Sequence, residues 1–194
     1  MNTKALALLT LFAVSCGPPQ VSSEETARRA FLGLDRSIGK SLTLGFAGFN
    51  AASSANIPDQ STTGDDGGTL TISGQVDQGA SANKGMRLKV AMAAYSDGVV
   101  SFDGGTVRLV FATSSDQPAL NLQLKNIPDG TYTGSLAGTY QMQDDLTGTV
   151  QLDLSMSGQL ENDGSGKTRR KVGTTTVTGT ATSASGVFQV NVTQ

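Results

Sequence analysis

The pattern that most constrains the fold is an alternation of apolar and polar residues with a period of two, which begins after Lys40. The clearest run is Val150, Leu152, Leu154 and Met156, with polar residues between them. Successive side chains of a β-strand point to opposite faces of the sheet, so this pattern predicts strands with one buried and one solvated face. Such strands belong to antiparallel sheets, because a parallel sheet is covered on both faces.

The same pattern predicts about nine or ten strands. They are expected at residues 42–46, 70–76, 86–92, 99–102, 107–111, 120–124, 131–142, 150–156, 172–182 and 186–193. Five Asp-Gly pairs, beginning at residues 66, 97, 103, 129 and 163, supply the positive φ of tight hairpin turns. The stretch from Ala51 to Asp66 lacks any pattern and predicts a mobile loop. We therefore expect a mainly β protein whose strands form an antiparallel meander, closed as a barrel or folded as a sandwich.

One amphipathic helix is expected before these strands, over residues 22–39. Ser22 and Glu25 fit a capping box at its start, and Gly39 is the expected residue just beyond its end. Apolar residues follow at helical spacing on one face: Ala27, Ala30, Phe31, Leu34 and Ile38. The stripe either packs on the sheet or lies on a membrane surface. Packing is favoured, because the stripe is modest and the acidic start repels anionic headgroups.

The first sixteen residues, MNTKALALLTLFAVSC, end at the only cysteine of the chain. Lys4 precedes an apolar run, Ala5 to Val14, that has the length of a signal-peptide core and is too short to span a bilayer. A single cysteine cannot form an internal disulfide, so an exported protein needs another reason for it.

This segment resembles the signal peptide and lipobox of bacterial lipoproteins, with Ala13, Val14 and Ser15 standing before Cys16. The resemblance implies that residues 1–15 are a signal peptide cleaved before Cys16. It also implies that the Cys16 thiol takes a diacylglycerol and that its amine is acylated, for example with palmitate. The alternative is a buried or uncleaved thiol.

The domain organisation follows from that resemblance. Residues 16–21 would be the lipidated cysteine and a short tether, and residues 22–194 a single β-rich domain. Gly17 is similar to the signal that sends such lipoproteins to the outer membrane. The expected location is therefore the bacterial cell envelope, on the outer membrane and facing the periplasm or the cell surface.

Several kinds of chemistry are disfavoured by composition. The chain contains no histidine, which removes the commonest general base and the commonest metal ligand. A formal net charge of −2 argues against nucleic-acid binding. We expect no enzyme, no catalytic or metal-binding residue, and no cofactor beyond the covalent lipid on Cys16.

The densest charge cluster follows a motif that resembles the end of a phosphate-binding loop. The segment GSGKT occupies residues 164–168, but Glu161 stands where the first glycine is needed and β-rich sequence follows where a helix is needed. A basic hairpin tip is therefore predicted. The tip is either solvated or contacts an anionic lipid, a lipopolysaccharide phosphate or an acidic partner. The cationic residues are Lys167, Arg169, Arg170 and Lys171.

Two pairs of adjacent carboxylates are the remaining candidates for chemistry, Asp65-Asp66 and Asp144-Asp145. Such pairs can hold calcium or serve glycoside hydrolysis. The chain lacks the ligand series of an EF-hand, and with no Trp and three Tyr it offers little surface for stacking a sugar. Solvation of turns is the favoured interpretation. Residues 70–78 and 154–162 are also similar, through either duplication or composition.

Two functions remain. The first is a non-catalytic structural or interaction role at the envelope, with the membrane bound through the anchor and an envelope protein or a lipid as partner. The second is a carrier that holds an apolar ligand between sheet and helix. They differ in whether the inward side chains fill the interior or line a void. The relevant residues are Met86, Leu88, Val90, Met92, Leu109, Phe111, Leu152 and Leu154.

Overall fold

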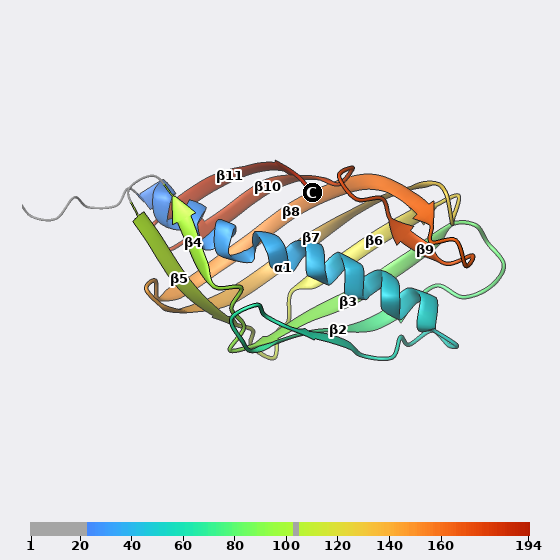
Figure 1. Ribbon diagram of the computed structural model, residues 1–194, viewed down its shortest axis with the longest axis horizontal. Coiled ribbons are helices and arrows are strands. Elements are labelled where there is room, and N and C mark those ends of the chain that lie inside the picture. The colour runs from blue at the N-terminus through green and yellow to red at the C-terminus, as the bar shows by residue number, and fades with distance from the viewer. Residues whose placement is uncertain (1–22, 103–104) are drawn as a thin grey trace, which may run out of the picture.

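Residues 23–102 and 105–194 are described by a computed structural model of the chain, and their architecture is mainly β. In these residues one helix, α1 (Ser23–Ala51), precedes a single antiparallel sheet of eleven strands (Figure 1). The strands are β1 (Gln60–Thr63), β2 (Thr69–Val76), β3 (Lys84–Ala93), β4 (Val99–Phe102), β5 (Gly105–Ala112), β6 (Ala119–Lys125), β7 (Thr131–Asp144), β8 (Gly148–Asn162), β9 (Thr168–Arg170), β10 (Thr176–Ser183) and β11 (Gly186–Thr193).

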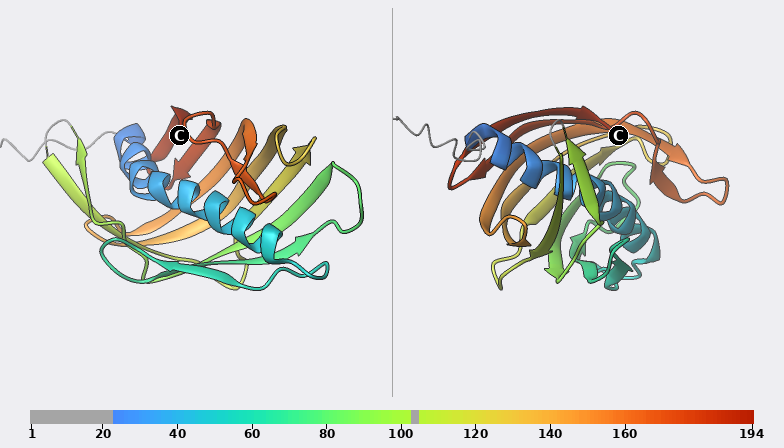
Figure 2. Two further views of the ribbon diagram at one scale, coloured as in Figure 1. Left: turned by 45° about the vertical axis from the view of Figure 1, so that its right-hand side comes forward. Right: turned by 60° about the vertical axis from the view of Figure 1, so that its left-hand side comes forward.

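The sheet is open rather than closed. Its order is β1-β2-β3-β6-β7-β8-β10-β11, with β5 pairing the far part of β7, β4 pairing β5, and β9 pairing β8. The end strands β1 and β11 do not pair, so the expected barrel is not formed, and the described strands make no second sheet for a sandwich. The sheet instead curves around α1, which lies across its concave face (Figure 2).

The helix is longer than the sequence pattern indicates. The prediction that it ends at Gly39 is wrong, and so is the prediction of a strand at residues 42–46, because α1 continues to Ala51. Leu42 and Phe46 are buried at helical spacing after Ile38, whereas Leu44 is only partly buried. Gly39 instead lies where Arg170 approaches the helix: a Cβ at this position would lie 3.1 Å from Nη2 of Arg170, so that side chain would have to shift slightly. Ser22, the expected cap, lies outside the described residues.

The expected loop between the helix and the sheet is partly ordered. Strand β1 lies within it and pairs with β2, and Asn56 forms an isolated bridge with Gln75. The sequence QSTT of β1 carries no apolar residue, which explains why hydrophobic alternation does not reveal this strand.

Inward-facing glycines shape the sheet where it meets the helix. Gly74 and Gly179 have φ of +132° and +136°. A Cβ at Gly74 would lie 2.3 Å from the carbonyl oxygen of Arg87, and one at Gly179 would lie 2.1 Å from that of Asp153. A side chain at either position would therefore collide with the neighbouring strand, and the positive φ itself favours glycine.

The core lies between α1 and the concave face of the sheet. The eight inward side chains named above as the test between a filled interior and a void are all buried. They form one cluster with the apolar residues on one face of α1. Two polar contacts also fix α1. The side chain of Asn50 bonds both backbone groups of Thr168, at 2.7 and 3.1 Å, and Gln194 Nε2 donates to the carbonyl and the carboxylate of Asp35.

Candidate functional site

The four predicted cationic residues lie in β9 or next to it, but their side chains have different surroundings and do not form one patch. Arg169 pairs with Glu161 at 2.9 Å, and Arg170 is half-buried over α1 beside Gly39. Lys167 and Lys171 are exposed and make no ion pair within the described part of the chain. Contact of this cluster with an anionic surface stays a prediction.

The segment GSGKT forms a hairpin tip whose backbone N–H groups are bound by the side chains of the two residues before it. Asn162 Oδ1 accepts the N–H groups of Gly164 and Gly166, at 2.9 and 3.0 Å. Asp163 Oδ1 accepts the N–H groups of Ser165 and Lys167 and the Ser165 hydroxyl. The hydrogen bond from that hydroxyl, followed by those from the two amides, lowers the pKa of Asp163. The donors that would hold a phosphate are thus occupied, and a strand follows instead of a helix.

The two carboxylate pairs meet at one arginine. Arg108 contacts Asp66 at 2.6 Å and also pairs with Asp144, while its backbone N–H donates to Asp145 at 2.7 Å. The fourth carboxylate, Asp65, pairs with cations of α1. The pairs therefore join the β1–β2, β4–β5 and β7–β8 segments, and the described residues contain no group of three or more metal-ligating side chains that could hold an ion.

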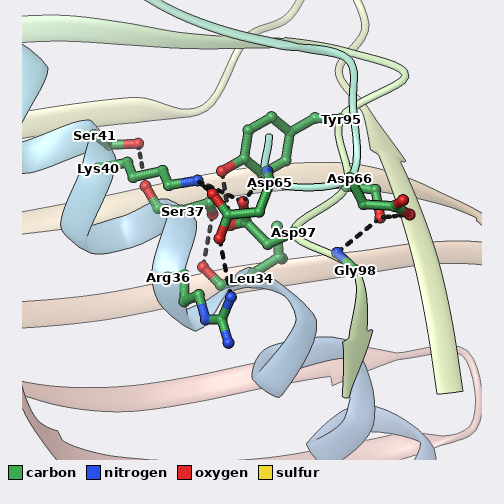
Figure 3. A network of polar contacts seen from close by, with 11 residues as sticks. Leu34, Arg36, Ser37, Lys40, Ser41, Asp65, Asp66, Tyr95, Asp97 and Gly98 are labelled. Atoms are coloured by element: carbon green, nitrogen blue, oxygen red, sulfur yellow. Dashed lines mark hydrogen bonds and ion pairs between the residues drawn. The ribbon is translucent and has the colours of Figure 1, made fainter. Parts of the chain in front are cut away.

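A half-buried polar network connects the β1–β2 loop and the β3–β4 loop to α1 (Figure 3). Lys40 Nζ contacts Asp65 at 2.8 Å and Asp97 at 2.6 Å, and the Tyr95 hydroxyl donates to Asp97 at 2.7 Å. Arg36 Nη1 contacts Asp65 at 3.0 Å from the exposed side.

Protonation in this network is strongly biased. Burial opposes the charge on Lys40, but its hydrogen bonds to Asp65 and Asp97 outweigh burial and raise the pKa of the amine. Burial, followed by the hydrogen bond to Asp97, raises the pKa of the Tyr95 hydroxyl. Lys40 is therefore a fixed cation and Tyr95 a fixed hydrogen-bond donor at neutral pH, so neither is poised to transfer a proton.

An open groove of about 460 Å³ runs beside this network along the outer side of α1. Arg170 overhangs it, with Nη1 3.4 Å from the Thr175 hydroxyl, and makes no ion pair within residues 23–102 and 105–194. The buried Oε1 of Gln194 has no hydrogen-bond partner among the described residues. The groove is lined by Asp35, Arg36, Gly39, Lys40, Thr43, Leu44, Thr62, Arg170 and Gln194.

The outer edge of β11 is the other notable surface. Gln194 and Thr175 exchange both backbone hydrogen bonds, and in an antiparallel ladder every second pair does so. In this register the backbone N–H and C=O groups that point toward β10 and bond to it belong to Gly186, Phe188, Val190 and Val192. The groups of the four residues between them point to the open edge, and these residues are exposed: Val187, Gln189, Asn191 and Thr193.

Sequence reasoning found neither the Lys40 network nor the groove. Both join residues that are distant in the chain, and no local spacing indicates them. The edge had a signal that alternation does not use: GVFQVNVT contains no charged residue and no proline, the two devices that protect natural edges. The predicted lipidation site, Cys16, lies outside the described residues. No helix in the described residues is long and apolar enough to cross a membrane.

Comparison with known proteins finds no match for this chain among protein families, curated proteins or solved structures.

Proposed function

We propose that this protein is a lipid-anchored protein of the bacterial cell envelope with a structural or interaction role and no catalytic activity. The observation that supports its attachment is the short apolar run that ends at the single cysteine, Cys16. The observation that supports interaction is the exposed, uncharged edge of β11, because an unpaired strand edge accepts another strand through backbone hydrogen bonds.

The packed interior also supports an interaction role over a carrier that holds its ligand between sheet and helix. The inward side chains that would line a void in a carrier are packed against α1 instead. The carboxylate pairs have a structural explanation as well, because Arg108, Arg36 and Lys40 bind them.

The basic tip lies far from the start of α1. α1 begins toward one end of the molecule and β9 lies toward the other (Figure 1), and Asn50 near the helix end bonds Thr168. A helix of 29 residues spans about 43 Å at 1.5 Å per residue. With the anchor at residue 16, the cations would therefore face an envelope partner rather than the lipid beside the anchor.

Acylation of the full chain in a bacterium tests the anchor. The wild-type protein should incorporate labelled palmitate and sediment with membranes, whereas Cys16→Ala should remain unlabelled and uncleaved at that site. Ser15→Ala is the matched control, since it keeps a small residue before the cysteine and should be labelled. Labelling of Cys16→Ala would refute the anchor.

A carrier role is the second candidate, and the groove beside α1 favours it. Its volume of about 460 Å³ falls within the range of small-molecule sites. Arg170 overhangs it, and Gln194 offers an unpaired buried acceptor. These features fit an amphiphile with an anionic headgroup that carries a hydrogen-bond donor.

Mass spectrometry of the envelope-purified protein separates the two candidates. A covalent lipid persists under denaturing conditions, whereas a bound amphiphile is seen only under native conditions. If the groove binds one, Arg170→Gln should lose that mass. Arg169→Gln should keep it, because Arg169 pairs with Glu161 outside the groove. Equal native and denaturing masses in the wild type would exclude a co-purifying ligand.

A further inference from the structure

We propose that β11 pairs antiparallel with β11 of a second copy of this chain, so that two sheets join into one across a twofold axis. The inference rests on the proposed function in one respect: a shared membrane brings the two edges together. The pairing geometry itself comes from the described strands.

The open edge fixes one register. Among the described residues, the backbone groups of residues 187, 189, 191 and 193 have no strand partner on this side. The register in which all four form bonded pairs of a new antiparallel ladder pairs them with one another. A twofold axis beside Val190 places Val187 opposite Thr193 and Gln189 opposite Asn191 of the second copy. Each bonded pair exchanges two hydrogen bonds, so every unpaired group of the edge is satisfied.

The side chains agree with this register. Gln189 and Asn191, whose amides both donate and accept, face each other on the exposed surface. On the other surface Val190 meets Val190, and Phe188 meets Val192. No charged residue occurs in β11, so the symmetric pairing brings no like charges together.

The other open edges of the described sheet are less suited to a partner. Strand β1 has four residues and lies beside the ion pair of Arg36 and Asp65. Strand β4 also has four residues, and its end is covered by Arg29, whose guanidinium lies 3.6 Å from the centroid of Phe102. Short strands and nearby charges limit edge-to-edge pairing. β11 is twice as long and contains no charged residue or proline; the nearest charge described for it is Asp35, bonded by Gln194 beyond the strand end.

The proposed pairing is a weak one between two membrane-attached copies rather than a tight dimer in solution. A single pair of eight-residue edges buries less than the roughly 1,200 Å² typical of stable interfaces. Attachment of both copies to one membrane raises their effective concentration without any new contact. Pairing should therefore be strong on membranes and weak in dilute solution.

Disulfide trapping in the full chain tests the register. Two differently tagged copies are co-expressed, one with Val187→Cys and the other with Thr193→Cys. The proposed ladder places these residues opposite each other, with Cα atoms about 5.5 Å apart, within the range for a disulfide. The matched control combines Val187→Cys with Asn191→Cys, which the same register displaces by two residues. A mixed dimer in the first combination, and little in the control, is expected.

Proline substitution tests the edge hydrogen bonds. Gln189→Pro, added to the copies with Val187→Cys and Thr193→Cys, removes an N–H that faces the open edge and leaves the ladder with β10 intact. It removes two intermolecular bonds per dimer, so the trapped fraction should fall by about tenfold or more. Gln189→Ala keeps the N–H and should keep trapping. Thermal unfolding of both variants shows that the fold is retained.

The outcomes separate the two proposals. If the protein is acylated and membrane-bound but both cysteine combinations trap equally, or neither traps, self-pairing is wrong and the anchor stands. If the protein is neither acylated nor membrane-bound, the anchor is wrong, and the same trapping on concentrated purified chain decides self-pairing. Trapping that survives Gln189→Pro also overturns the proposed ladder.

Discussion

At the scale of single residues, the contact between Lys40 and Asp97 is the most consequential. The Asp97 side chain is 7% exposed and that of Lys40 26% exposed, so the carboxylate depends on its partners for solvation. Tyr95 supplies one hydrogen bond and Lys40 the charge. Loss of the amine would leave a buried carboxylate with two neutral donors, the Tyr95 hydroxyl and the Asp65 backbone N–H, and no compensating charge, which is costly.

Lys40→Met should therefore destabilise the protein by about 2 kcal/mol. Arg36→Met is the matched control on the same helix, since the Arg36 side chain is 66% exposed in its pair with Asp65, and it should cost at most about 0.5 kcal/mol. Urea unfolding at pH 7 measures both. Equal losses would show that Lys40 does not support the buried carboxylate.

Glu25 gives a prediction for pH. Its hydrogen bond to Arg28 comes first among the causes and, with that to Arg29, outweighs burial and lowers the pKa of this carboxyl from 4.5 to about 2. A lowered pKa stabilises the folded state above the unfolded pKa, and this contribution is lost as the pH falls from 4.5 toward 2. Glu25→Gln should thus be less stable than wild type by about 1 kcal/mol at pH 6.

The difference in the free energy of unfolding between wild type and Glu25→Gln should disappear near pH 2. Denaturant titrations at several pH values measure it. A difference that stays constant across this range would mean that the ionised carboxylate is not its source.

Residue contacts of this kind are largely outside what sequence predicts. The motif GSGKT was correctly assigned to a hairpin tip, because Glu161 and the β-rich residues after it exclude a phosphate loop. The partners of Asp65 and Asp66 were not predictable, since Arg36 and Arg108 lie 29 and 42 residues away. Only the path of the sheet brings them together.

At the scale of elements, the helix shows how two periods can coincide. Leu42 and Phe46 are four residues apart, which suits both a strand face and a helix face. The intervening Leu44 distinguishes the two, and it is only partly buried. Gly39 strengthened the error, because glycine commonly follows helix ends, whereas here it allows Arg170 to approach.

The strand glycines give the prediction at this scale. Gly179→Ala should destabilise the protein by about 3 kcal/mol or more, because the new Cβ adds a collision with the Asp153 carbonyl to the strain of positive φ. Gly173→Ala is the control: its φ is +77° and nothing lies within 4 Å of the added atom, so about 1 kcal/mol is expected. Thermal unfolding of the two variants measures the difference, and similar losses would contradict the collision.

At the scale of the whole molecule, alternation predicted a mainly β antiparallel fold but not its open form. Alternation states which face is buried, and a barrel, a sandwich and an open sheet around a helix bury the same residues. Two features accompany the open form: the positive φ of Gly74 and Gly179 inside their strands, and the full length of α1, which occupies the concave face. Neither these backbone angles nor the helix length is encoded in a period of two.

The separation of the two ends of α1 leads to a prediction about attachment. On the proposal that Cys16 carries the anchor, Lys167→Ala combined with Lys171→Ala should leave membrane retention unchanged after a high-salt wash, because the tip lies beside the C-terminal end of α1. Cys16→Ala cannot be lipidated at this position, so its mature form should be missing from the washed membranes. If the double variant is washed off by salt, the tip itself contacts the membrane.

The contacts that hold α1 also set the order in which the molecule can assemble. Asp35 is bound by a residue 159 positions later, and Asn50 by one 118 positions later. A chain still emerging from a ribosome or a translocation channel therefore carries the helix with its apolar stripe uncovered. Folding that depends on such distant contacts is slow and is completed only after the last strands arrive.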